Sequence, residues 1–184
     1  KPAKQRAMDG LSGRRIEELH ATAASLWYTG YVLGDIIEAV RPASAVERLV
    51  LEEHVTNMEI WRLENEVRHA GDQASSMTLQ RQSINSERNR LIYQINTTIF
   101  KQCEMWLSQR EGELQSESPG AIIDRMSILR LKIFHGIDAN EELNDLVQCL
   151  SSLMKGIATG RKYFKLYRNL KTYEDEDCRH YPVA

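Results

Sequence analysis

The sequence has few of the residues that interrupt helices or build covalent frameworks. It contains four prolines, three cysteines and no CxxC pair, so neither a disulfide framework nor a zinc site is indicated, and a reducing cytoplasm is favoured. No apolar run approaches the ~20 residues that span a bilayer, so we expect no membrane segment. Basic and acidic residues nearly balance, at 24 and 26, which argues against a dedicated nucleic-acid binder.

Motifs of the common enzyme classes are also missing. We find no Ser-His-Asp arrangement, no glycine-rich phosphate loop and no dinucleotide-binding fingerprint, and therefore predict no cofactor. Glu17 with His20 and Glu66 with His69 have the Glu-x-x-His spacing of di-iron bundles. Such pairs arise by chance in a glutamate-rich helical chain, and Glu66 and His69 face away from the side of Glu64 on their helix. No metal site is predicted.

Apolar residues at helical spacing run through most of the chain. Between Pro42 and Pro119 they recur at steps of three and four, with few alternating stretches. A chain of 184 residues is long enough to bury a sizeable core as one domain. We therefore predict an all-α fold, a single-domain irregular bundle of five or six helices over residues 1–184.

Capping residues and glycines set the predicted bounds of the first helices. A continuous apolar stripe predicts a first helix over residues 11–41, which Gly30 and Gly34 could bend. Ser44 and Glu47 form a capping box that starts a second helix, ending near residue 70.

The later helices are bounded in the same way. A third helix is predicted from about residue 72 to 109, followed by a polar loop over residues 110–118. Ser118 and Pro119 are an N-cap and a first-turn proline, which open a helix through His135. The last long helix begins near Asp138.

The segment 161–173 interleaves five basic residues with four aromatic ones. We interpret it as an amphipathic helix that docks its aromatic side on the bundle. Nucleic-acid binding is the alternative, but the acidic run over residues 174–177 would neutralise much of the positive charge.

The second helix carries polar residues where its apolar stripe should continue. Glu53, Asn57 and Glu64 interrupt that stripe. Asn57, Trp61, Glu64 and Arg68 are spaced by four, three and four residues and so share one helix face.

The next two helices show the same anomaly. Arg81 and Arg88 fall on the apolar line of the third helix, and Asn85 and Asn89 flank Arg88 within one turn. The fourth helix is apolar nearly all round, which predicts a central position. It nevertheless carries three charged residues, Asp124, Arg125 and Lys132.

Two interpretations of these charges remain open, because a buried charge is costly unless it is paired or binds a ligand. One is an internal salt-bridge network in which Glu64 pairs with Arg88 and Asp124 pairs with another arginine. The other is a cleft for an anionic or hydroxyl-rich ligand. The candidate ligand-binding residues are Asn57, Trp61, Arg68, Asn85, Arg88, Asn89, Arg125, Lys132 and Arg168, with Glu64 and Asp124 as candidate general acid or base.

Four blocks of this sequence resemble a bacterial family known as domain of unknown function 4254. They are NMEIWRLENEVR (57–68), NSERNRLI (85–92), SESPGAIIDRMSILRLKIFH (116–135) and RKYFKLYRNLKTYEDED (161–177). Their order agrees with the family over residues 44–177, leaving 178–184 as a tail. The chain departs from the family at Asn65, Arg90 and Ser118, where aspartate, an acidic residue and threonine are usual.

The resemblance implies an all-helical cytoplasmic bacterial protein whose relatives are often encoded near glycosyltransferases of cell-surface polysaccharide assembly. It implies no catalytic residue. The leading hypothesis is therefore binding of a phosphorylated sugar or nucleotide-sugar. The alternative is a non-catalytic accessory protein that docks a glycosyltransferase or a second copy of itself, which an exposed apolar stripe on the first helix would favour.

Overall fold

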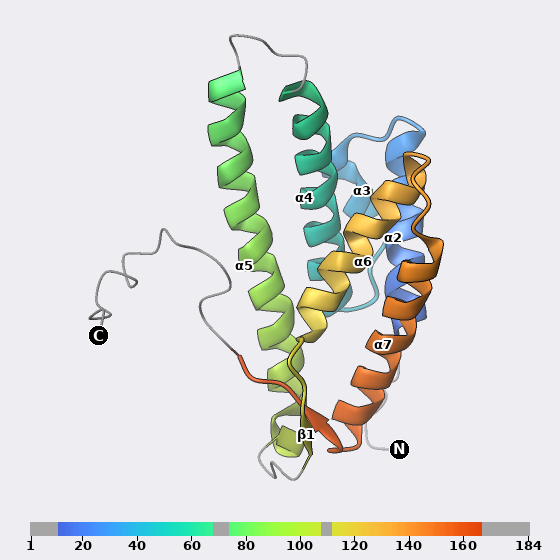
Figure 1. The fold of residues 1–184 in the computed structure, drawn as a ribbon, viewed down its shortest axis with the longest axis vertical. Coiled ribbons are helices and arrows are strands. Elements are labelled where there is room, and N and C mark those ends of the chain that lie inside the picture. The colour runs from blue at the N-terminus through green and yellow to red at the C-terminus, as the bar shows by residue number, and fades with distance from the viewer. Residues whose placement is uncertain (1–10, 68–73, 108–111, 167–184) are drawn as a thin grey trace, which may run out of the picture.

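Helices make up nearly all of the chain that the computed structural model describes, which is residues 11–67, 74–107 and 112–166. In this part of the chain there are six helices and two very short strands. Their order is α2 (Gly13–Tyr28), α3 (Leu33–Val40), α4 (Ala45–Val67), α5 (Ala74–Leu107), β1 (Glu113–Leu114), α6 (Pro119–Phe134), α7 (Asn140–Ala158) and β2 (Lys162–Tyr163). The predicted all-α bundle is confirmed (Figure 1).

The single helix predicted over residues 11–41 is wrong, because the structure has two helices there. α2 ends at Tyr28 and α3 begins at Leu33. Between them Gly30 has a φ of 98°, a conformation that residues with a side chain rarely adopt. The apolar spacing continues on both sides of this turn, which is why the sequence pattern alone indicates one helix.

α4 and α5 form a long antiparallel pair (Figure 1). Ser44 caps the start of α4 as predicted, because Glu47 N donates to Ser44 Oγ at 3.2 Å. The donor of the return bond of the box is Ala43 N instead of Ser44 N, and it donates to Glu47 Oε2 at 2.7 Å. Arg15 of α2 donates two hydrogen bonds, of 2.9 and 3.1 Å, to the same Glu47 carboxylate. The cap of α4 therefore also ties α4 to α2.

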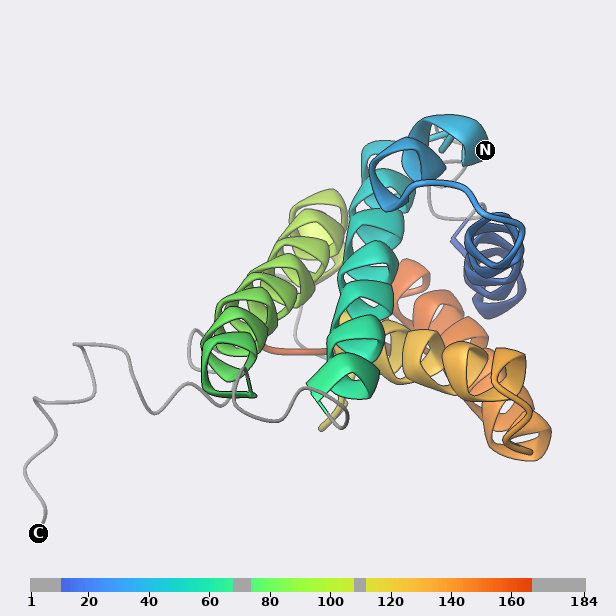
Figure 2. The same cartoon turned by 90° about the horizontal axis from the view of Figure 1, so that it is seen from above.

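α6 occupies the central position that its apolar surface predicts, in contact with α2, α4, α5 and α7. It begins at Pro119 and the Ser118 side chain caps it, as predicted. Gly120 lies against α5, where an added Cβ would be 2.8 Å from the carbonyl oxygen of Ile92. The Gly120 N–H donates to Asn96 Oδ1 at 2.7 Å. Seen from above, α4 lies between α5 on one side and α2 and α6 on the other (Figure 2).

The chain after α7 is extended rather than helical. β2 pairs in parallel with β1, which lies in the predicted polar loop. The amphipathic helix predicted over residues 161–173 is therefore wrong for 161–166, and 167–173 lie outside the described residues. Phe164 is only 2% exposed and contacts the edge of Phe100 of α5, with ring centroids 6.1 Å apart. Burial of this aromatic residue holds the strand against the bundle.

The hydrophobic core joins the six described helices. Each helix contributes fully buried aliphatic side chains, among them Ile16, Ile36, Val50, Ile95, Ile123 and Leu150. One core therefore positions the polar residues described next.

Candidate functional site

A line of polar side chains follows the contact between α4, α5 and α6, three helices that touch one another. We call it the polar seam. Its inner end is fully buried, and its outer end is half-buried or exposed. From inside to outside it consists of His20, Glu53, His54 and Ser127, then Asn57, Arg88 and Asp124, and finally Trp61, Glu64, Arg81, Asn85, Lys132 and His135.

An ion pair between Arg88 and Asp124 forms the centre of the seam. Arg88 Nε donates to Asp124 Oδ1 at 2.6 Å, and Arg88 Nη2 donates to Asp124 Oδ2 at 2.5 Å. This two-point geometry matches a planar guanidinium to a carboxylate. The Arg88 side chain remains 22% exposed, against 10% for Asp124. The pair therefore joins α5 to α6 where the buried region meets solvent.

Asn57 connects this centre to the inner end. Its amide nitrogen donates towards Asp124 Oδ1 at 3.2 Å, Ser127 Oγ at 2.9 Å and Glu53 Oε1. An amide carries two hydrogens, so three acceptors compete for them. Protonation of Glu53 relieves this competition, because a neutral carboxyl group carries a hydrogen and can donate a hydrogen bond itself.

The protonation state of Glu53 follows from its burial. Its side chain is 0% exposed, and its Oε2 has no hydrogen-bond partner among the described residues. Burial, together with the neighbouring Asp124 carboxyl, raises the pKa of Glu53 well above its usual range. Burial therefore favours the protonated, neutral form of Glu53 beside the Asp124 carboxylate.

Asp124 is in the opposite state. Burial raises its pKa, but hydrogen bonds from Arg88 and Glu53 and the positive charge of Arg88 have the larger combined effect, so the pKa lies below its usual value. Two neighbouring carboxyl groups are thus held in different states, one protonated and one ionised. Environments that separate two pKa values in this way supply the acid and the base in several enzymes.

At the inner end two histidine rings are held neutral. His54 Nε2 lies 3.1 Å from the backbone oxygen of His20, which can only accept, so Nε2 carries the hydrogen and Nδ1 accepts from Ser127 Oγ at 2.7 Å. The His20 ring stacks on His54 with centroids 4.4 Å apart. Burial lowers the pKa of His54 to about 3 and that of His20 well below its usual range. Because Ser127 and His54 are fully buried, their contact is structural and not an accessible nucleophile.

The outer end is built from an ion pair and a ring stack. Arg81 of α5 donates to Glu64 of α4 at 2.7 Å, and both side chains are half-exposed. Trp61 stacks on His135, with centroids 4.7 Å apart and planes at 14°. The buried indole Nε1 of Trp61 has no partner among the described residues. Half-buried Lys132 lies one turn before His135. The outer end therefore contains an ion pair between α4 and α5 and a ring stack between α4 and the end of α6.

The structure brings together four of the predicted site residues, Asn57, Asn85, Arg88 and Asp124, in one hydrogen-bonded group. The predicted partner of Glu64 is wrong: it is Arg81 and not Arg88. α5 runs antiparallel to α4, so a residue late in α4 meets a residue early in α5, and Arg88 lies farther along α5 beside Asn57.

Other predicted residues lie apart from this group. Arg125 is exposed and pairs with glutamates outside the seam, 2.9 Å from Glu117 and 3.8 Å from Glu142. Asn89 is half-buried and its side chain has no hydrogen-bond partner in the described part of the chain. Arg68 and Arg168 lie outside the described residues.

Sequence reasoning assigned no site role to Glu53, His54, Ser127 or His20. The signal for Glu53 was present, because it interrupts the apolar stripe of α4 four residues before Asn57. Nothing in the sequence indicates that His20 of α2 stacks on His54, since that contact depends on how α2 packs.

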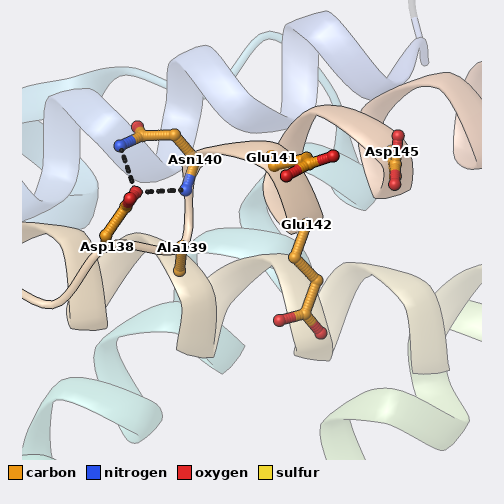
Figure 3. Close-up of a pocket in the computed structure, with 6 residues that line it drawn as sticks. All are labelled: Asp138, Ala139, Asn140, Glu141, Glu142 and Asp145. Atoms are coloured by element: carbon orange, nitrogen blue, oxygen red, sulfur yellow. Dashed lines mark hydrogen bonds between the residues drawn. The ribbon is translucent and has the colours of Figure 1, made fainter.

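A separate hollow of about 360 Å³ lies at the turn between α6 and α7 (Figure 3). Asp138 accepts hydrogen bonds from the backbone and side-chain nitrogens of Asn140 at 3.4 and 3.1 Å. Asp138, Glu141 and Glu142 lie in or beside the first turn of α7, where the helix dipole favours negative charge, and Asp145 lies in the second turn. Within the described ranges no group of three or more His, Cys, Asp or Glu side chains is arranged to hold a metal ion. The residues that line the hollow are Asp138, Ala139, Asn140, Glu141, Glu142 and Asp145.

Comparison with known proteins agrees with the resemblance seen in the sequence. In the described part of the chain no helix is long and apolar enough to cross a bilayer. No curated protein and no solved structure matches the chain. Residues 47–143, just over half of the chain, match the family described as Protein of unknown function (DUF4254). This range contains all of α5 and α6 and all but the first two residues of α4, the helices of the polar seam. The chain belongs to the DUF4254 family.

Proposed function

We propose that this protein binds a phosphorylated sugar or a nucleotide-sugar at the polar seam, in the metabolism of cell-surface polysaccharides. The observation that carries the proposal lies at the outer end of the seam, where the buried indole Nε1 of Trp61 has no hydrogen-bond partner among the described residues. Buried polar atoms without partners are rare in native proteins and call for an explanation.

The outer end has the chemistry that such a ligand needs. Arg81, Arg88 and Lys132 supply positive charge for a phosphate group. The stacked rings of Trp61 and His135 offer a flat apolar surface of the kind that packs against a sugar or a nucleobase. In this proposal the anionic group of the ligand lies between the cations, and its ring lies against Trp61.

The centre of the seam could add acid–base chemistry. Asp124 is ionised and slightly exposed, and Glu53 behind it holds a proton. A ligand hydroxyl that reached Asp124 would meet a general base that its neighbouring acid can reprotonate. Glu53 and Asp124 replace the predicted pair of Glu64 and Asp124 in this role, because Glu64 is bound to Arg81 at the surface.

A ligand panel measured by thermal shift tests the proposal. The purified chain is screened against sugar phosphates, nucleotide-sugars, free nucleotides and divalent metals. A ligand at a hundred times its dissociation constant stabilises the folded state by about 2.7 kcal/mol and should raise Tm by several degrees. We expect the response from the phosphorylated sugars.

Variants at the seam distinguish specific from general anion binding. Lys132→Gln should reduce the thermal shift, whereas Lys155→Gln, which removes an exposed charge from α7, should leave it unchanged. Arg88→Ala should abolish the shift, although that variant also leaves Asp124 without its partner. An equal shift in the Lys132, Lys155 and Arg88 variants would exclude the seam as the binding site.

A second candidate function is a non-catalytic accessory protein that docks a glycosyltransferase or a second copy of itself. It is favoured by the exposed side chains of Tyr28, Tyr31 and Val32, at the end of α2 and in the turn that follows. It is also favoured by the fact that most polar groups of the seam pair with one another. No response to any ligand of the panel would favour this function.

A further inference from the structure

Four large hydrophobic side chains are exposed at one end of the bundle. Tyr28, Tyr31 and Val32 lie at the turn between α2 and α3, with 71%, 48% and 69% of their surface exposed, and Ile137 follows α6 with 49% exposed. Both turns lie at the upper right end of the bundle in Figure 1. The ring centroids of Tyr28 and Phe134 are 6.2 Å apart, so the ends of α2 and α6 are in contact. We call these four exposed residues the tip patch.

The tip patch is unusual within this molecule. In the described part of the chain only two other large hydrophobic side chains are exposed, Leu79 on α5 and Leu114 on β1, and they lie on different elements. Single exposed apolar residues are ordinary, whereas a group of them at one place marks an interaction surface.

Acidic residues flank the patch on both sides. Asp35 follows Val32 in the first turn of α3. On the other side Asp138 is next to Ile137, and Glu141 and Asp145 line the hollow that begins there (Figure 3). None of these four carboxylates has an ion-pair partner among the described residues, in contrast to Glu38, which pairs with Arg48 at 2.9 Å. One cation, Lys132, also lies beside the patch, because its carbonyl oxygen accepts from Ile137 N at 2.9 Å. Four unpaired carboxylates against this one cation leave the edge of the patch with a net negative charge.

We propose that the tip patch docks a basic amphipathic segment of a partner protein. Apolar side chains of that segment would cover Tyr28, Val32 and Ile137, and its lysines or arginines would meet Asp35, Asp138 and Glu141. The negative charge around the tip patch favours a basic partner segment over the other occupants. A second copy joined tip to tip would bring carboxylates against carboxylates, and an anionic membrane would be repelled by the same groups. The inference does not depend on the ligand proposed for the seam.

A peptide of defined chemistry tests the docking. The probe is a fluorescein-labelled helical peptide with leucine on one face and lysine on the other, and its control has glutamate in place of lysine. Fluorescence anisotropy should show that the lysine peptide binds the full chain, more weakly at high salt, and that the glutamate peptide does not bind. Failure of the lysine peptide to bind would overturn the proposal, as would equal binding of both peptides.

Matched variants locate the binding surface. Val32→Ser and Ile137→Ser should each weaken binding by about tenfold, the effect of withdrawing one buried aliphatic contact. Leu79→Ser removes a side chain of similar exposure, 68%, from α5 and should change nothing. Asp138→Asn should weaken binding and reduce its salt dependence. Equal affinities in the Val32 and Leu79 variants would place the binding elsewhere and overturn the proposal.

Two further measurements address the other occupants. If the wild-type chain self-associates in sedimentation experiments, Val32→Ser should not abolish that association. Vesicles of neutral or anionic phospholipid should not bind the chain. Dimerisation or vesicle binding that requires Val32 would replace the basic partner with a second copy or a membrane. Circular dichroism of each variant confirms that it is folded before binding is measured.

Discussion

The most consequential single residue is Glu53, because folding changes its affinity for a proton. In the unfolded chain its carboxyl group ionises around its ordinary pKa of 4.5, whereas burial in the folded chain raises that pKa well above its usual range. At a pH between these two pKa values, Glu53 carries a proton in the folded state that it has lost in the unfolded state. By linkage, Glu53 destabilises the folded state increasingly as pH rises through this window.

Glu53→Gln should therefore become more stable than the wild type as pH rises. Glutamine has the shape of the protonated acid and can still accept from Asn57 and donate to Asp124. Near pH 4 the two proteins should be similar, and above about pH 4.5 the difference in free energy of unfolding should grow by about 1.4 kcal/mol per pH unit, until the pH passes the folded-state pKa. Urea denaturation from about pH 4 to 8 measures this difference. A difference that did not change with pH would mean that Glu53 is ionised in the folded protein.

The histidines shape the same profile in the opposite direction. His20 and His54 are neutral in the folded chain because their pKa values are lowered, so protonation of the unfolded state removes stability as pH falls below about 6.5. The wild-type curve contains both effects, which is why the comparison with Glu53→Gln is needed to isolate the carboxyl group.

α3, like α7, begins without a side-chain cap. Serine side chains cap the first turns of α2, α4 and α6, as when Ser12 Oγ accepts from Arg15 N at 3.2 Å. α3 begins after Val32, which offers no side-chain cap, and it buries only Ile36 fully. Its place in the fold depends on packing against α2 and α4 more than on its own ends.

Val32→Ser should stabilise the protein. Val32 already has the extended backbone of an N-cap residue, and a hydroxyl there can accept from the free N–H groups of the first turn, which contributes about 1 kcal/mol. Little burial is lost, because Val32 is largely exposed. Val32→Ala, which removes the same apolar surface without adding a cap, is the control for thermal melting. If the two variants melted together, the cap would contribute nothing.

On the scale of the whole molecule, one core and one seam join all the helices. Buried aliphatic residues of α2 to α7 form one cluster, and the seam ties α4, α5 and α6 by charged hydrogen bonds. We expect cooperative unfolding, with far-ultraviolet circular dichroism and tryptophan fluorescence reporting the same urea midpoint. Separate midpoints would show that the pair α4 and α5 unfolds independently of the other helices.

The sequence predicted the helices well and the site only in part. Apolar spacing and caps such as Ser44 and Ser118 act within a few residues, so they are readable locally. The break at Gly30 was missed because the apolar stripe continues across it. Glu64 pairs with Arg81 instead of the predicted Arg88, and this depends on the offset between two antiparallel helices. The contact of His20 with His54 depends on how α2 packs.

The close approach of α6 to α5 at Gly120 also has a genetic consequence. Every single-nucleotide change in a glycine codon that alters the amino acid introduces a Cβ atom or a stop. A Cβ at this position would lie 2.8 Å from the carbonyl oxygen of Ile92 and 2.9 Å from Oδ1 of Asn96. A library of all point mutants should therefore be depleted at codon 120 under selection for folded protein, because no neutral step leads away from glycine.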